Sequence, residues 1–234
     1  MRCAIHQPQF LPWLGYLNKI HSADIFVFLD DVQFKKNEFQ NRNRIRVGGE
    51  AKWITVPVSY DFGNSIRETR IASGPDWRRK MKLTLRQNYS KAPFFKDFAP
   101  ALFELLDRKW KNLAELNIAS VKWLTECFEI RTRTLISSDL TKDISSDGTT
   151  ATDRLIQICA QVGADTYISG AGGRGYLEEE KFETAGLALE YQDFLHPEYP
   201  QCYTYGNGFL SYLSAVDGLF NCGGGAEGRK RLNL

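Results

Sequence analysis

The sequence predicts an α/β fold with a Rossmann-like, mainly parallel sheet. Four short apolar segments have the length of buried strands, and segments with helical periodicity connect them in pairs. A strand, a helix and a second strand in succession form a βαβ unit, which implies parallel pairing. The strands are expected at residues 2–6, 25–29, 134–137 and 165–169, and the connecting helices at 13–20 and 151–162.

The middle of the chain is predicted to be a helical insertion at about residues 74–128. Before the insertion, Gly48-Gly49 predicts a hairpin turn into a strand at 53–58. No segment is rich enough in Pro, Gly or Ser to form a linker, so residues 1–234 are expected to form a single domain. The three amphipathic helices of the insertion are expected at 76–88, 94–106 and 113–128.

The composition excludes several classes of protein. Of 234 residues, 43% are hydrophobic and 25% are charged, which excludes disordered, collagen-like and coiled-coil chains. The formal net charge of +2 gives no overall basic field for nucleic acid. A mean hydropathy of −0.36 and an N-terminus without an apolar core predict a cytoplasmic protein with no membrane span. Five widely spaced cysteines and three histidines predict neither a disulfide framework nor a metal site.

The first candidate site is the turn that follows the first strand. His6, Gln7 and Gln9 lie there, before a helix that begins near Trp13. Ligands bind at the carboxyl edge of open α/β sheets, where this turn is expected. His6 is therefore a candidate general base, and the two glutamines are candidate ligand contacts. In the alternative interpretation, His6 is a buried histidine with satisfied hydrogen bonds and the prolines only shape the turn.

The same segment resembles the entry motif of nucleotidylyltransferases and class I synthetases. Those proteins carry His-x-Gly-His at the start of their first helix, where this chain has Trp13-Leu14-Gly15-Tyr16. The resemblance implies a nucleotide pocket without the histidines that adenylyl transfer needs. Trp13 and Tyr16 would then stack on a base or a sugar ring.

The second candidate is the glycine-rich segment after the strand at 165–169. Gly170, Gly172 and Gly175 fit the pattern G-x-G-x-x-G, and Glu190 follows Gly170 by 20 residues, as in a dinucleotide-binding fingerprint. We favour an anion-binding loop, because the helix expected at 176–185 is short and acidic. The alternative is a surface turn with a solvated arginine. The residues proposed to hold the anion are Ser169, Gly170, Gly172, Gly173 and Arg174.

Two further segments carry polar groups that could serve a site. Asp30 and Asp31 follow the second strand, where one carboxylate could act as a base or hold a sugar hydroxyl, or could only initiate a turn. His196 lies in a polar and aromatic loop and is the second candidate base.

The stretch at residues 35–46 is rich in Lys, Arg and Asn. Arg42, Asn43 and Arg44 could contact phosphate or RNA, or could form a solvated face.

Blocks of sequence along nearly the whole chain resemble the WbqC-like proteins. The resemblance implies a link with bacterial O-antigen, capsule and other surface glycans, and a role in attaching an acyl or aminoacyl group to an amino sugar. Because Gln33 lies in one of these blocks, the resemblance also makes it a candidate binding residue. The blocks are His6–Gln9, Leu11–Tyr16, Asp30–Phe34, Asn41–Ile45, Ser169–Arg174, Tyr176–Leu177, Gln192–Phe194, His196–Pro197, Tyr199–Gln201 and Phe209–Gly223.

The leading hypothesis is a transferase that acts on a nucleotide-linked or lipid-linked amino sugar. His6 or His196 would take the proton of the sugar amine, and aminoacyl-tRNA is a possible donor. Two alternatives remain open: an ATP-using nucleotidylyltransferase or ligase, and a non-catalytic protein that binds a nucleotide sugar. No cofactor is predicted with certainty, and a homo-oligomer is possible.

Overall fold

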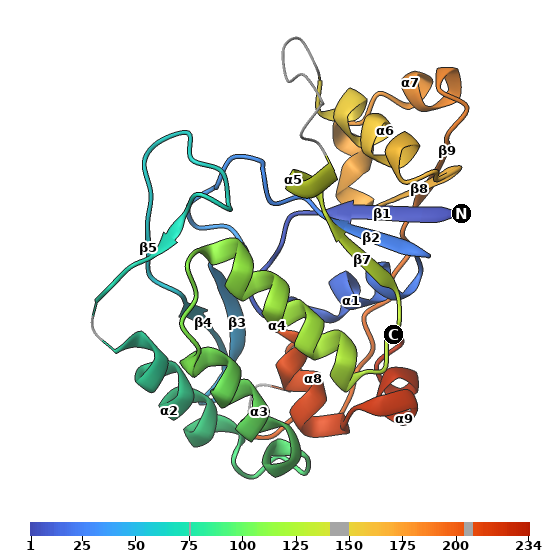
Figure 1. The fold of residues 1–234 in the computed structure, drawn as a ribbon. Coiled ribbons are helices and arrows are strands. Elements are labelled where there is room, and N and C mark those ends of the chain that lie inside the picture. Colours follow the sequence, from blue (N-terminus) through green and yellow to red (C-terminus); the bar gives the residue numbers. More distant parts are fainter. Residues whose placement is uncertain (75, 141–149, 204–207) are drawn as a thin grey trace.

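The computed structural model describes residues 1–74, 76–140, 150–203 and 208–234. A five-stranded sheet in the described part has the strand order β7-β2-β1-β8-β9, and every neighbouring pair is parallel (Figure 1). The sheet strands are β1 (Arg2–His6), β2 (Ile25–Phe28), β7 (Arg133–Ile136), β8 (Thr166–Ser169) and β9 (Ala188–Tyr191). This arrangement confirms the predicted α/β, Rossmann-like fold class. The particular resemblance to nucleotidylyltransferases stays a prediction.

Helices cover both faces of the sheet and form two separate apolar cores. On one face, α1 (Leu14–His21), α4 (Leu113–Cys127) and α8 (Ala215–Cys222) contribute to the larger core. On the other face, α6 (Ala151–Gln161) and α7 (Glu179–Thr184) pack on alternate side chains of the same strands. Ala4 and Phe26 point into the first core and Cys3 and Ile25 into the second, as expected for strands buried on both faces.

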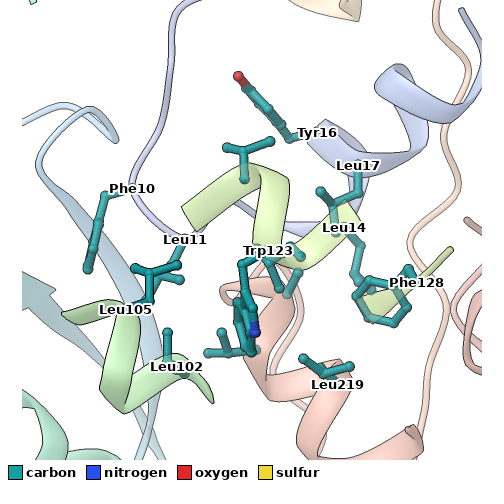
Figure 2. Close-up of a cluster of buried hydrophobic side chains, with 14 of the residues drawn as sticks. Phe10, Leu11, Leu14, Tyr16, Leu17, Leu102, Leu105, Trp123, Phe128 and Leu219 are labelled. Carbon is teal, nitrogen blue, oxygen red and sulfur yellow. The ribbon is translucent and has the colours of Figure 1, made fainter. Parts of the chain in front are cut away.

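The predicted insertion is helical and joins the larger core. Its helices are α2 (Trp77–Tyr89), α3 (Phe95–Asp107) and α4, and their buried side chains belong to the same cluster as those of α1. In Figure 2, Leu102 and Leu105 of α3 lie near Leu11, and Leu14 lies near Phe128. The single-domain organisation stays a prediction.

Smaller elements lie outside the main sheet. The predicted hairpin is present, but its second strand ends earlier than expected, because Pro57 has no N–H and separates β4 from β5. The predicted helix at 176–185 is shortened to α7, and a 3₁₀ turn, η2, precedes it. The Ser- and Asp-rich composition of residues 137–149 predicts a loop. The segment begins with the short helix α5, and residues 141–149 lie outside the described residues. The bounds are β3 (Arg42–Val47), β4 (Glu50–Thr55), β5 (Val58–Ser59), β6 (Arg70–Ile71), α5 (Ser137–Leu140), η2 (Ala171–Gly175) and α9 (Gly225–Arg231). No helix in these described ranges is long and apolar enough to cross a lipid bilayer.

The irregular segment between β1 and α1 connects the sheet to the helices. Asn117 of α4 is fully buried, and its Nδ2 donates to the carbonyls of Pro8 at 2.9 Å and of Gln40 at 2.6 Å. Both carbonyls belong to chain segments without regular secondary structure, so a side chain has to supply the donor that a helix or sheet would supply.

Asn117→Leu is therefore expected to lower the free energy of unfolding by about 1–3 kcal/mol, because it leaves buried carbonyls without a partner. Urea denaturation followed by circular dichroism measures this change. Gln87→Leu on the exposed face of α2 is the control and should change stability by less than about 0.5 kcal/mol. Equal effects of the two substitutions would contradict this role of Asn117.

Candidate functional site

A cavity of about 430 Å³ lies at the carboxyl ends of β1 and β8. The strand order reverses between these two strands, since the chain moves from β1 to β2 and β7 on one side and from β8 to β9 on the other. Ligands of open α/β sheets bind at such a switch point. His6 and Gln7 line the cavity from β1, and Ser169 and Gly170 line it from β8. The fold therefore brings the first and second candidate segments to one site.

His6 lines this cavity with a neutral imidazole. Its Nδ1 lies 3.0 Å from the carbonyl of Gln7, and because a carbonyl only accepts, Nδ1 carries the proton and Nε2 is the acceptor. Burial, and to a smaller extent the positive charge of Lys19, lower the pKa of His6 to about 4. The Tyr16 ring packs edge-on against the imidazole, with the ring centroids 5.0 Å apart. His6 is thus held in one orientation and is unprotonated at neutral pH.

The glycine-rich segment lines the opposite wall, and its glycines differ in their surroundings. A Cβ added at Gly170 or Gly172 would meet no atom within 4 Å, so internal packing does not require glycine at either position. A Cβ at Gly173 would lie 2.1 Å from Ser169 Oγ and 3.0 Å from Leu177 Cδ1, so a larger residue there would displace both side chains. Gly170 and Gly172 therefore leave free space in a wall of the cavity, where a ligand can approach the backbone closely.

Two cations that the sequence analysis did not select also line the cavity. Arg154 of α6 pairs with Asp31, with 2.6 Å between Nη2 and Oδ2. Lys19 of α1 is only 3% exposed, and its Nζ donates to the carbonyl of Ile5 at 2.9 Å. Nothing in the local sequence distinguishes Lys19 from a solvated lysine on an exposed helix face.

Several predicted site residues do not line this cavity and serve the surrounding structure. Asp30 is buried, and its oxygens accept hydrogen bonds from Ser137 and from the backbone and hydroxyl of Ser138 at the start of α5. Asp31 accepts from Ser137 as well as pairing with Arg154. Gln9 has a buried Oε1 without a hydrogen-bond partner among the described residues.

Trp13, Tyr16 and His196 also lie outside the cavity lining. The Trp13 and His196 rings are parallel, with centroids 6.4 Å apart. Both His196 nitrogens are engaged: Nδ1 lies 2.9 Å from the carbonyl of Pro197, and Nε2 accepts from the backbone N–H of Tyr212 at 3.2 Å. The Tyr16 hydroxyl donates to the carbonyl of Gln7 at 3.1 Å.

The glycine between Trp13 and Tyr16 is explained by packing. A Cβ at Gly15 would lie 2.2 Å from the Trp13 indole, so this glycine makes room for Trp13.

The basic stretch forms part of the β3–β4 hairpin. The Arg42 guanidinium lies 4.1 Å from the centre of the Trp53 ring, and that of Arg44 lies 5.7 Å from it. Asn43 is fully buried, and its Nδ2 donates to the carbonyls of Phe10 and Leu11. Arg42, Asn43 and Arg44 do not line the cavity.

Gln33 and Arg174 lie away from the cavity lining as well. Gln33 is exposed and forms an isolated bridge with Ser65. The Arg174 guanidinium lies 4.1 Å from the centre of the Tyr191 ring, a cation–π contact. In the described ranges, no group of three or more His, Cys, Asp or Glu side chains is arranged to hold a metal ion.

A doubly wound sheet with a cavity at its switch point defines an α/β protein of the Rossmann-like class. The chain belongs to the WbqC-like protein family, whose model matches residues 7–227, and this confirms the family predicted from the sequence. It is 34% identical over 226 residues to a protein of Mycobacterium tuberculosis named "Uncharacterized protein Rv1507c", and the alignment covers 95% of this chain and 94% of that relative. No solved structure matches the chain.

Gly172 has open space for an added Cβ and Gly173 does not, and this difference can be tested by measuring the stability of alanine variants. Gly173→Ala should lower the free energy of unfolding by about 1–3 kcal/mol, because the added methyl group collides with Ser169. Gly172→Ala should change it by less than about 0.5 kcal/mol, because the methyl group meets no atom within 4 Å. Chemical denaturation of both variants measures the difference, and equal destabilisation would argue against the open wall.

The low pKa of His6 also predicts how the free energy of unfolding depends on pH. Because its pKa is about 4 in the folded protein and about 6.5 in the unfolded chain, the unfolded state binds more protons between these values. The free energy of unfolding should therefore fall as the pH decreases through this range.

We expect His6→Gln to reduce the loss of stability between pH 7 and pH 5 by about 1–2 kcal/mol. Urea titrations at both pH values measure it. His21→Gln at the end of α1 is the comparison and should reduce the loss by less, because partial burial and the charge of Arg229 lower the pKa of His21 to a smaller extent. A His6→Gln protein with the wild-type pH dependence would show that this histidine titrates normally.

Proposed function

We propose that this protein is a transferase of bacterial surface-glycan biosynthesis that attaches an acyl or aminoacyl group to an amino sugar linked to a nucleotide or a lipid. The observation that carries the proposal is the unprotonated His6 imidazole in the cavity at the switch point. Membership of the WbqC-like family adds the glycan context that the sequence resemblance implies. The acyl donor and the sugar belong to the proposal.

In this proposal the cavity receives the reacting end of the amino sugar, and His6 receives a proton. The sugar nitrogen forms a bond to the acyl carbon of an activated ester or thioester, and the bond from that carbon to the leaving group breaks. His6 Nε2 accepts the proton that the nitrogen loses, because Nδ1 already carries one. The leaving group departs with the bonding electrons and takes up a proton. Aminoacyl-tRNA is one donor of this type.

His6 is a better candidate for the base than His196 in this proposal. His6 lines the cavity, whereas His196 lies among aromatic rings and both of its nitrogens have backbone partners. Gly170 and Gly172 support the proposal because they leave one wall of the cavity open to a ligand.

The first experiment measures thermal stability with nucleotide-linked sugars, lipid-linked sugars and ATP. A ligand that binds only the folded state raises the melting temperature by mass action. The second experiment measures the transfer of radiolabelled acyl or aminoacyl groups to the amino sugar that binds. His6→Gln should keep the shift in melting temperature and lower turnover by about 10²–10⁴-fold. His196→Gln is the matched control and should retain turnover.

The outcomes separate the proposal from its alternatives. Binding of a nucleotide sugar without any transfer would assign the protein as a non-catalytic binding protein. Release of pyrophosphate from ATP would assign it as a nucleotidylyltransferase or ligase. Full turnover of His6→Gln would remove His6 from the reaction.

A further inference from the structure

The carboxyl ends of β1 and β8 separate at the floor of the cavity. The two strands pair from Arg2 with Thr166 as far as Ala4 with Ile168. Beyond this point β1 continues to pair only with β2, and β8 only with β9. The carbonyl of Ile5 would otherwise face a continuing ladder on the β8 side, and it accepts a hydrogen bond from Lys19 Nζ instead. The ammonium group thus occupies the position where the two strands part.

Lys19 has no acidic partner in the described part of the protein. Its Nζ makes one hydrogen bond, to Ile5, and lies 5.9 Å from the centre of the Tyr167 ring. Its other ionisable neighbours are the buried thiols of Cys3 and Cys159 and the imidazole of His6. None of the described residues that line the cavity is Asp or Glu. Two of the three N–H groups of the ammonium therefore have no hydrogen-bond partner among the described residues.

The charge of Lys19 is maintained in spite of its burial. Burial lowers the pKa of Lys19 to about 8, so the ammonium form still predominates at neutral pH. Arg154, the second cation that lines the cavity, already has a counter-ion, because it is paired with Asp31. A buried charge without a counter-ion destabilises a folded protein, and an anionic ligand that pairs with the charge offsets that cost.

We propose that Lys19 forms the floor of an anion subsite, in which its ammonium group binds a carboxylate or phosphate group of the ligand. This inference rests on the cavity of the proposed function and assigns the charge of the group that enters it. The anion would accept hydrogen bonds from Nζ between the separated ends of β1 and β8. The open space beside Gly170 and Gly172 allows it to approach from the other wall.

A bound anion would also change the properties of His6. The positive charge of Lys19 is the second cause of the low pKa of His6, after burial. An anion on Lys19 would offset that charge, raise the pKa of His6 and so make it a stronger base. The protein would then acquire its effective base only when the anionic ligand is in place.

The test uses Lys19→Met, which keeps the length of the side chain and removes its charge. Lys122→Met on the exposed surface of α4 is the matched control. Melting temperatures are measured without anions and with inorganic phosphate, pyrophosphate, UDP or acetate. We expect one or more of these anions to stabilise the wild type and Lys122→Met, and Lys19→Met to bind it at least tenfold more weakly. A response to acetate alone identifies a carboxylate subsite, and a response to the phosphates identifies a phosphate subsite.

Stability without anions gives an independent readout. Lys19→Met should melt close to the temperature of the wild type, because the removal of an uncompensated buried charge offsets the loss of the hydrogen bond to the Ile5 carbonyl. A large fall in the melting temperature, or failure to fold, would show that the hydrogen bond to Ile5 is the main role of Lys19 and would overturn the proposal. Undiminished anion binding by Lys19→Met, or the absence of any anion effect on the wild type, would also overturn it.

An NMR titration of the wild type provides the third measurement. His6 is one of three histidines, and His6→Gln identifies its signal. The pKa of His6 should rise when the stabilising anion is present, and an unchanged pKa would contradict the subsite. Anion binding without any transfer reaction would refute the proposed transferase and leave this subsite intact.

Discussion

Residues 7–12 cross the interior of the protein without regular secondary structure, and buried side chains have to satisfy their backbone. The carbonyl of Leu11 accepts from Asn43 and Ser214, and its N–H donates to Ser120. Leu11 has a φ of 42°, a left-handed conformation that is unfavourable for leucine and is held by these three bonds. Pro8 and Pro12 reduce the number of hydrogen-bond partners that this segment needs, because neither residue has a backbone N–H.

These bonds come from parts of the chain that are far apart in sequence. Asn43 belongs to the β3–β4 hairpin, Ser120 to α4, and Ser214 caps α8. The turn after β1 therefore fixes the hairpin and the helical region relative to the sheet, and it also positions His6 and Gln7 at the cavity. Stability of the core and geometry of the candidate site depend on the same segment.

The candidate site combines residues that the sequence identified with residues that it did not. His6 and the glycine-rich segment could be found because each directly follows a strand, and the carboxyl ends of parallel strands meet at one edge. Lys19 and Arg154 lie inside helices, where sequence alone does not separate a solvated cation from one that enters a cavity. The opposite error arises for Asp30. A carboxylate after a strand can equally well accept a backbone N–H from a distant segment, as Asp30 does at the start of α5.

The sequence by itself determined the α/β class and the strands β1, β2, β7 and β8, because short apolar segments and helical periodicity are local properties. It did not predict β9. It did not determine the strand order β7-β2-β1-β8-β9 or the point at which β1 and β8 separate. Those features depend on packing between segments more than 100 residues apart. Tertiary structure alone therefore decided that Lys19 is buried without an acidic partner, because the burial and pairing of a charge depend on every segment that surrounds it.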